Sequence, residues 1–306
     1  MSRGGSSPST HYRQLKEMLE KKKLISWLYV IPVIVILISL IIFPLLYSLY
    51  LSFSQWDMTS FGAEPHFIGI GNFAQIFTDR RFFYDLGRTA VVVIGALIVE
   101  TLLGFGVALL LNRKFKGRGI LLAAFLMPVM VSEVTAGLIW GLIFDATFGP
   151  LNQIIAILHL AKKPIVWLVD HPLLSVIIAD IWQWSPFIML ITMAGLRALP
   201  SSPYEAAMLD GASGWQILKF ITLPLITPIL GVAVVLRSMD LIKMFGKIYM
   251  LTKGGPGTAS ETITYYIYLQ AFSFWNLPYA AALSFILLAI VTFFITYFFK
   301  MITVEE

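Results

Sequence analysis

Four side chains that could bind a polyhydroxylated solute share one face of a predicted membrane helix. Asp180, Gln183, Trp184 and Phe187 follow at i, i+3, i+4 and i+7, a spacing that places them on one side of a helix. Charged side chains inside a membrane usually face the bundle interior or a water-filled cavity. Aromatic rings stack on the apolar faces of sugars, and carboxylates and amides bond hydroxyls. The alternative is that these residues lie at the outer interface as an aromatic belt with Trp182.

A second set of candidate residues ends the next predicted membrane helix. Arg237, Asp240, Leu241 and Met244 share one helical face. Arg237 and Asp240 could pair with one another at i, i+3. A cationic Arg237 could instead contact an anionic sugar derivative, such as a phosphate, sulfonate or uronate. The sequence leaves both interpretations open.

Between these two helices lies a polar loop with strong local structure signals. Ser202 and Glu205 are spaced as a capping box, and Ser213 and Gln216 repeat that spacing. Gly211 can adopt the left-handed conformation that ends a helix. The loop is therefore predicted to hold a short helix, a glycine turn and a second helix that returns to the membrane. An ordinary amphipathic helix at the lipid interface is the alternative.

The composition indicates a membrane protein that crosses the bilayer several times. Of 306 residues, 58% are hydrophobic and 13% are charged, whereas soluble domains carry roughly 25% charged residues. The chain has no cysteine, and its net charge of +5 does not suggest nucleic-acid binding. The four histidines lack metal-ligand spacing, and no phosphate-binding Gly-x4-Gly-Lys-Ser/Thr motif occurs. A non-catalytic chain with no metal and no bound cofactor is therefore expected.

Hydropathy predicts an all-α membrane domain, residues 24–306, after a polar tail at residues 1–23. Each of six predicted spans is near or above the ~20 residues that cross the hydrocarbon. Residues 262–274 are too short and too polar to span, and are assigned to a re-entrant or surface helix. The predicted spans are 27–51, 89–111, 120–144, 173–196, 218–239 and 279–299.

The distribution of Lys and Arg predicts the orientation of these spans. With the N-terminus inside, 13 of the 22 basic residues lie on the cytoplasmic side and nine lie on the longer outer loops. Positive residues favour the cytoplasmic side. Both termini and the Glu205 loop are therefore predicted to be cytoplasmic.

The polar loop also resembles a known family signature. Glu205-Ala206-Ala207, then Gly211, then Ile221, Leu223 and Pro224 match the Glu-Ala-Ala motif of binding-protein-dependent ABC importer permeases at every defined position. Residues 67–73 and 251–256 resemble the first and last outer loops of the same family. The resemblance covers residues 24–303 and is to the carbohydrate type, similar to the maltose and glycerol-phosphate systems.

The resemblance implies a type I importer permease fold in a bacterial or archaeal inner membrane. The expected partners are membrane lipid, a second permease subunit in a heterodimer, two ATPase subunits that use ATP and Mg, and a soluble binding protein. Loop 201–219 would carry ATPase coupling. The residues implied to line the solute path are Asp180, Gln183, Trp184, Phe187, Arg237, Asp240, Leu241 and Met244. Arg237 and Trp184 depart from the maltose pattern, which argues against maltose as the solute.

A transporter driven by an ion gradient is the alternative from another class. It would need its own ion site and often contains an inverted repeat. Neither is evident, although Asp180 or Glu133 could carry a proton. A membrane scaffold or an integral membrane enzyme is a third and more remote interpretation.

Overall fold

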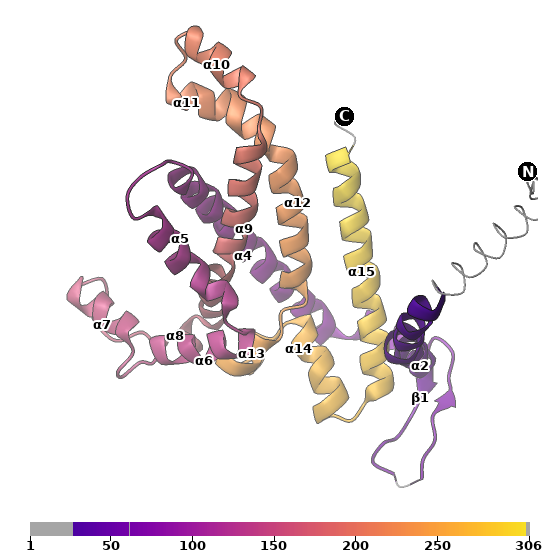
Figure 1. Cartoon of the computed structure of the whole chain (residues 1–306). Helices are drawn as coiled ribbons and strands as arrows, with labels where there is room; N and C mark the ends of the chain where they lie inside the picture. The colour runs from indigo at the N-terminus through magenta and orange to yellow at the C-terminus, as the bar shows by residue number, and fades with distance from the viewer. Residues whose placement is uncertain (1–26, 61, 304–306) are drawn as a thin grey trace, which may run out of the picture.

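The computed structural model describes residues 27–60 and 62–303, and these are mainly helical (Figure 1). Five helices are long and apolar enough to cross a membrane, and a bent pair could supply a sixth span. The predicted 1–23 tail lies outside the described residues. The five candidate spans among the described residues are Trp27–Ser52, Arg80–Leu111, Pro172–Ala198, Gly214–Ile242 and Leu277–Phe298.

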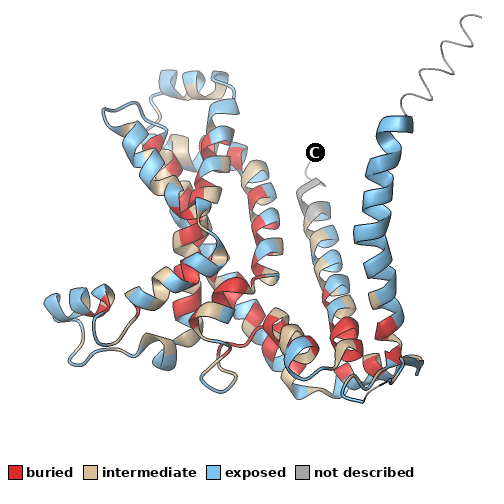
Figure 2. Cartoon of the chain, turned by 60° about the horizontal axis from the view of Figure 1, so that its bottom comes forward, coloured by how far each residue is buried: buried red, intermediate tan, exposed pale blue. Residues whose placement is uncertain are grey.

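The first span is exposed over most of its length. It contains a π-helical turn, η1 (Ile38–Ile42), and ends in α2 (Phe43–Ser52), which packs against the last helix. Figure 2 shows this helix as almost wholly exposed, while buried residues concentrate around α4 and α9. A short hairpin of β1 (Ser54–Gln55) and β2 (His66–Phe67) follows, and then α3 (Gly71–Thr78).

Helix α4 (Arg80–Leu111) and helix α9 (Pro172–Ala198) form the most extensive helix pair of the fold. A Cβ at Gly104 would lie 2.7 Å from the Cβ of Ile188, so glycine allows the close approach of the two helices. Helix α4 begins nine residues before the predicted span, because the Asp79 carboxylate accepts from the backbone N–H of Arg81 and caps the helix there.

The segment predicted as one span at 120–144 is not a continuous helix, although its two parts together could still form the sixth span. α5 (Arg118–Leu126) and η2 (Met127–Met130) turn by 105° into α6 (Glu133–Ile143). Pro128 cannot donate a backbone hydrogen bond, and the Ser132 hydroxyl accepts from Thr135 N–H to start a new helix. Short helices α7 (Pro150–Ile157) and α8 (Trp167–Asp170) complete this region.

Four helical segments follow the polar loop. α12 (Leu223–Ile242) packs on both α9 and α4, and the short α13 (Gly246–Leu251) packs on α6. Residues 262–274 form α14 (Ile263–Tyr268) and the π-helical η4 (Leu269–Ser273), which confirms a short helical segment that does not span. α15 (Leu277–Thr303) is the last helix and ends toward the same side of the molecule as the loop (Figure 1).

Candidate functional site

The polar loop folds into a helix pair that projects from the bundle (Figure 1). α10 (Ser202–Leu209) and α11 (Gly214–Ile217) flank a turn in which Gly211 has a φ of +74°, as predicted. Ser213 and Gln216 form the predicted capping box, with the Ser213 N–H donating to Gln216 Oε1 over 2.7 Å. α11 continues through η3 (Leu218–Thr222) into α12, and the Tyr204 hydroxyl lies 3.2 Å from that of Thr222.

The predicted capping box at Ser202 is wrong. α10 starts one position earlier than a Ser202 cap would allow, so Ser202 is already its first helical residue. The capping position belongs to Ser201, whose side chain makes no capping bond and whose carbonyl accepts from Glu205 N–H. A residue inside the first turn cannot also cap it, so Glu205 remains exposed rather than turned back on its helix.

The helix pair exposes large apolar side chains that cost free energy in water. Leu209 is 90% exposed and Trp215 is 70% exposed; Met208 is also exposed, as is Phe220 in the following η3. Each fully buried side chain of this kind contributes about 1.5–3 kcal/mol, so the surface suits a protein partner. The predicted coupling residues on this exposed segment are Glu205, Ala206, Ala207, Gly211, Ile221, Leu223 and Pro224, of which Ala207 and Ile221 are half-buried.

Below the helix pair, four charged side chains form a buried ion cluster of Glu100, Asp180, Arg237 and Lys247. The Arg237 guanidinium donates to Glu100 from Nε over 2.8 Å and from Nη2 over 3.2 Å. Arg237 and Lys247 both donate to the Asp180 carboxylate. All four side chains are at most 2% exposed. Arg237 also lies 4.8 Å from the ring centroid of Trp184.

The cluster corrects the interpretation in which Arg237 pairs with Asp240. Arg237 faces α4 and α9, where two carboxylates are buried, whereas Asp240 is exposed and lies 3.3 Å from Lys243. Burial favours the first arrangement, because a buried cation requires close counter-charges. The guanidinium is therefore occupied by protein carboxylates.

Sequence reasoning missed Glu100 and Lys247. Glu100 is the only acid in the predicted span 89–111, and an ionisable residue inside a span is by itself a functional hypothesis. Lys247 is one of the nine basic residues that the charge distribution predicts on the outer loops, yet its side chain is 0% exposed. The signal that could have found it is its apolar sequence context, with Phe245, Ile248 and Leu251 close by.

The remaining predicted lining residues divide between the cluster and the packed core. Gln183 Nε2 donates to the Val131 carbonyl over 2.6 Å, at the break between η2 and α6. Trp184 and Phe187 meet edge to face with ring centroids 6.1 Å apart. Leu241 and Met244 are buried in the main apolar cluster. The structure thus brings Asp180, Trp184 and Arg237 together and separates Asp240 from them; a lining role stays a prediction.

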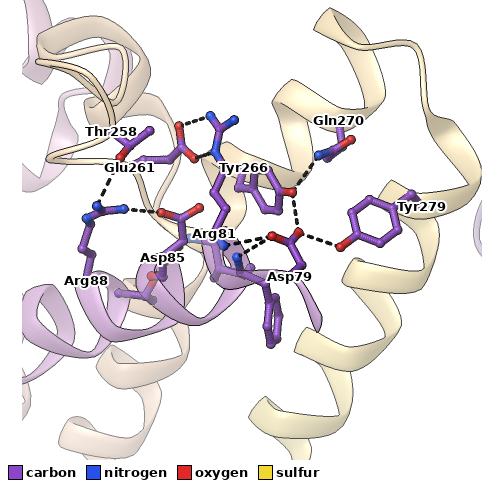
Figure 3. A network of polar contacts seen from close by, with 12 residues as sticks. Asp79, Arg81, Asp85, Arg88, Thr258, Glu261, Tyr266, Gln270 and Tyr279 are labelled. Carbon is purple, nitrogen blue, oxygen red and sulfur yellow. Dashed lines mark hydrogen bonds and ion pairs between the residues drawn. The ribbon is translucent and has the colours of Figure 1, made fainter. Parts of the chain in front are cut away.

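A second polar network ties the start of α4 to the last helices at the other end of the bundle (Figure 3). The Asp79 carboxylate accepts from the hydroxyls of Tyr266 over 2.6 Å and Tyr279 over 2.7 Å. Burial raises the pKa of Asp79, but the hydrogen bonds outweigh it, so the pKa lies below its usual value. The other pairs in the network are Arg81–Glu261, Arg88–Asp85, Arg88–Thr258 and Gln270–Tyr266.

The described residues contain no group of three His, Asp or Glu side chains that could hold a metal ion. The ion cluster holds two carboxylates, and both are engaged by protein cations.

Comparison with known proteins assigns the chain to a family. Residues 100–301 match the family described as binding-protein-dependent transport system inner membrane component. The chain is 36% identical to the trehalose/maltose transport system permease protein MalF of Thermococcus litoralis, covering 83% of this chain and 84% of that one. It is 31% identical to the sulfoquinovosyl glycerol transport system permease protein SmoG of Agrobacterium fabrum, covering 88% and 87%.

A solved structure supports the fold. The chain resembles a subunit of a bacterial ABC transporter involved in the import of the acidic polysaccharide alginate, with a TM-score of 0.81 and 21% identity over 95% of this chain and 98% of that one. The fold is thus that of a type I ABC importer permease. The chain belongs to the family of inner membrane components of binding-protein-dependent transport systems.

Proposed function

We propose that this chain is a permease subunit of a binding-protein-dependent ABC importer that moves a sugar or sugar derivative into the cytoplasm. The relatives named above include a trehalose/maltose and a sulfoquinovosyl glycerol permease. The observation that carries the proposal is the exposed helix pair α10–α11, whose apolar side chains need a partner surface. An ATPase subunit would provide that surface.

The proposed assembly has a second permease subunit, two ATPase subunits and a soluble binding protein. The binding protein would deliver solute to the outer mouth, and ATP-driven closure of the ATPase subunits would move the helix pair. α9 and α12 both lead away from that pair, so movement there would reach the membrane domain directly. ATP and Mg would be bound by the partner subunits.

The ion-gradient alternative is weakened by the contacts of its two candidate carboxylates. Asp180 is paired with two cations. Glu133 Oε2 accepts from the backbone N–H of Gly246 over 3.2 Å, which caps α13. A proton carrier must release and rebind its proton during each cycle, and both groups instead hold neighbouring elements together.

Reconstitution into vesicles tests the proposal. Uptake of radiolabelled sugar by the assembled importer should require ATP and the binding protein, and should proceed without an ion gradient. Uptake that is driven by a proton or sodium gradient in the absence of ATP would overturn it. A thermal-shift screen of the binding protein against sugars, polyols and acidic sugars would identify the solute to use.

The proposed orientation places both termini and the helix pair in the cytoplasm. The absence of cysteine makes single-cysteine labelling clean. A Ser202→Cys variant should react with an impermeant thiol reagent only when the reagent reaches the inner side. Labelling of this variant from the outside of intact cells would show that the orientation is the opposite of the one proposed.

A further inference from the structure

Two interruptions of the membrane helices lie against the same face of α9. The first interruption separates η2 from α6, and there the Val131 carbonyl accepts from Gln183. The second separates α12 from α13, and on its two sides Arg237 and Lys247 both bond to Asp180. Asp180 and Gln183 are neighbours one turn apart on α9. One helix face thus holds both interruptions.

The second interruption separates α12 from α13, a short helix that packs mainly on α6 and also contributes Ile248 and Leu251 to the main apolar cluster. α13 rests on α6: a Cβ at Gly137 would lie 2.8 Å from the Cβ of Met250, and Glu133 caps the first turn of α13 at Gly246. We call α6 and α13 the outer unit. α9 and α12, in contrast, both continue to the helix pair α10–α11. Lys247 is the residue of the outer unit that reaches the Asp180 carboxylate on α9.

The charges of the cluster are balanced, so the Lys247–Asp180 contact can be removed by substitution without leaving an unpaired charge. Two cations face two carboxylates at no more than 2% exposure. Removing one charge from a buried pair leaves its partner uncompensated, which is strongly destabilising. Removing one cation together with one carboxylate keeps the cluster neutral. Arg237 could then remain paired with Asp180 while the contact to the outer unit is lost.

We infer that Lys247 is a positioning residue for transport: through Asp180 it ties the outer unit to α9 and holds it until movement of the helix pair releases it. The inference rests on the proposed function, because that movement comes from the ATPase subunits. Rigid, packed helices carry such coupling when they have two discrete arrangements. Loss of the tie favours the other arrangement, so the resting importer would hydrolyse ATP without waiting for the binding protein.

The decisive variants are Lys247→Met and the neutral double variant Glu100→Gln with Lys247→Met. The readouts are the thermal stability of the assembled importer and its ATPase activity in nanodiscs with and without loaded binding protein. We expect the single variant to be destabilised and the double variant to recover stability. In the double variant, stimulation by the binding protein should fall by about fivefold or more, in the range of typical coupling energies, because basal activity rises. Lys243→Met is the matched control, since Lys243 is 61% exposed and lies four residues away.

The outcomes separate the inference from the proposed function. A wild-type importer without stimulated ATPase activity would contradict the proposed function itself. A wild-type importer with normal stimulation, together with a stable double variant that is stimulated equally, would show that Lys247 only balances charge and would overturn the inference alone.

A cysteine pair tests the same tie if the double variant fails to assemble. Asp180→Cys with Lys247→Cys also keeps the cluster neutral and leaves the Arg237–Glu100 pair in place. A short bifunctional thiosulfonate reagent should join the two cysteines and arrest stimulated ATPase activity, and dithiothreitol should restore it. The wild-type chain, which has no cysteine, controls for reaction with other subunits. Full stimulated turnover in the cross-linked importer would overturn the inference.

Discussion

The helix pair α10–α11 and the buried ion cluster share α9 and α12, yet they are built in opposite ways. The helix pair is held by local bonds, such as Ser213 with Gln216, and exposes Leu209 at 90%. The cluster joins residues 57, 67 and 137 positions apart and is almost fully enclosed. Asp180 lies about 27 Å along α9 from the end of that helix at Ala198, at 1.5 Å per residue.

This difference separates two tasks. When an exposed apolar surface belongs to a locally stable segment, a partner protein can bury it without disturbing the rest of the chain. A buried set of charges contributes little net stability, but it strongly penalises any arrangement that separates its members. The helix pair is therefore suited to contact another protein, and the cluster is suited to fix the relative positions of four helices.

The largest expected effect follows from the turn of the helix pair. Gly211→Val forces a β-branched side chain into a φ of +74°, at a cost on the order of 1–3 kcal/mol. The strain is local, so the protein should still insert, but the misplaced pair should abolish ATP-driven uptake. The measurement is uptake at equal membrane abundance.

Gly211→Asn is the matched control for this substitution. Asparagine tolerates the left-handed conformation better than other residues, and no heavy atom lies within 4 Å of the added Cβ. Uptake should therefore be largely retained. If Gly211→Val supports uptake at the wild-type rate, the turn has no role in coupling.

The second effect contrasts a buried carboxylate with an exposed one. Asp180→Asn leaves the cations Arg237 and Lys247 with one remaining carboxylate, and loss of a buried partner costs roughly 3–5 kcal/mol. Asp240→Asn removes only an exposed i, i+3 pair, worth roughly 0.2–1 kcal/mol at most. Thermal unfolding in detergent should show a large loss of stability for Asp180→Asn and almost none for Asp240→Asn. Equal stability of the two variants would contradict the structural role of the cluster.

Sequence reasoning found the helix pair because its determinants are local. The capping box at Ser213 and the glycine turn at Gly211 each depend on a few consecutive residues. The one local error, at Ser202, concerned a helix start displaced by a single residue. The general positions of the spans were also predicted, since they follow from apolar length alone.

The break after Met130 and the ion cluster could not be found in the same way. Pro128 is compatible with a continuous membrane helix, and Ser132 is followed three residues later by Thr135, so it lacks the Glu or Gln that completes a capping box. Arg237 had a plausible neighbour at Asp240, whereas its actual partners come from α4 and α9. Pairing over such distances is decided by packing, which residue spacing does not reveal.

A third and smaller effect concerns the first interruption. Gln183→Leu keeps most of the side-chain volume but leaves the Val131 carbonyl without its donor. A half-buried acceptor that loses its partner costs about 1–3 kcal/mol. The loss should be below that of Asp180→Asn in the same unfolding assay. Gln153→Leu, on an exposed side chain, is the control. A Gln183→Leu variant as stable as this control would mean that the break is held by packing alone.

The smallest effect lies in the outer polar network, away from both regions. The pKa of Asp79 is below its usual value: burial raises it, but the Tyr266 and Tyr279 hydroxyls that donate to the carboxylate lower it further. A carboxyl group with a depressed folded-state pKa contributes stability above its unfolded pKa, and this contribution is lost as the pH falls through the folded value. Removing the two donors should therefore reduce stability at neutral pH by about 1 kcal/mol per bond and weaken its pH dependence below about pH 4.

The double variant Tyr266→Phe with Tyr279→Phe tests this argument, because it keeps both rings and removes both hydroxyls. Thermal unfolding at a series of pH values should show that the double variant is less stable than the wild type. This difference in stability should be constant at neutral pH and should narrow as Asp79 becomes protonated. Tyr297→Phe is the control, since Tyr297 is 57% exposed. The stability of this variant should stay close to that of the wild type at every pH. If the stability difference between the double variant and the wild type does not change with pH, the lost stability comes from neutral hydrogen bonds and packing. The network would then differ from the buried ion cluster, whose effect on stability depends on charge.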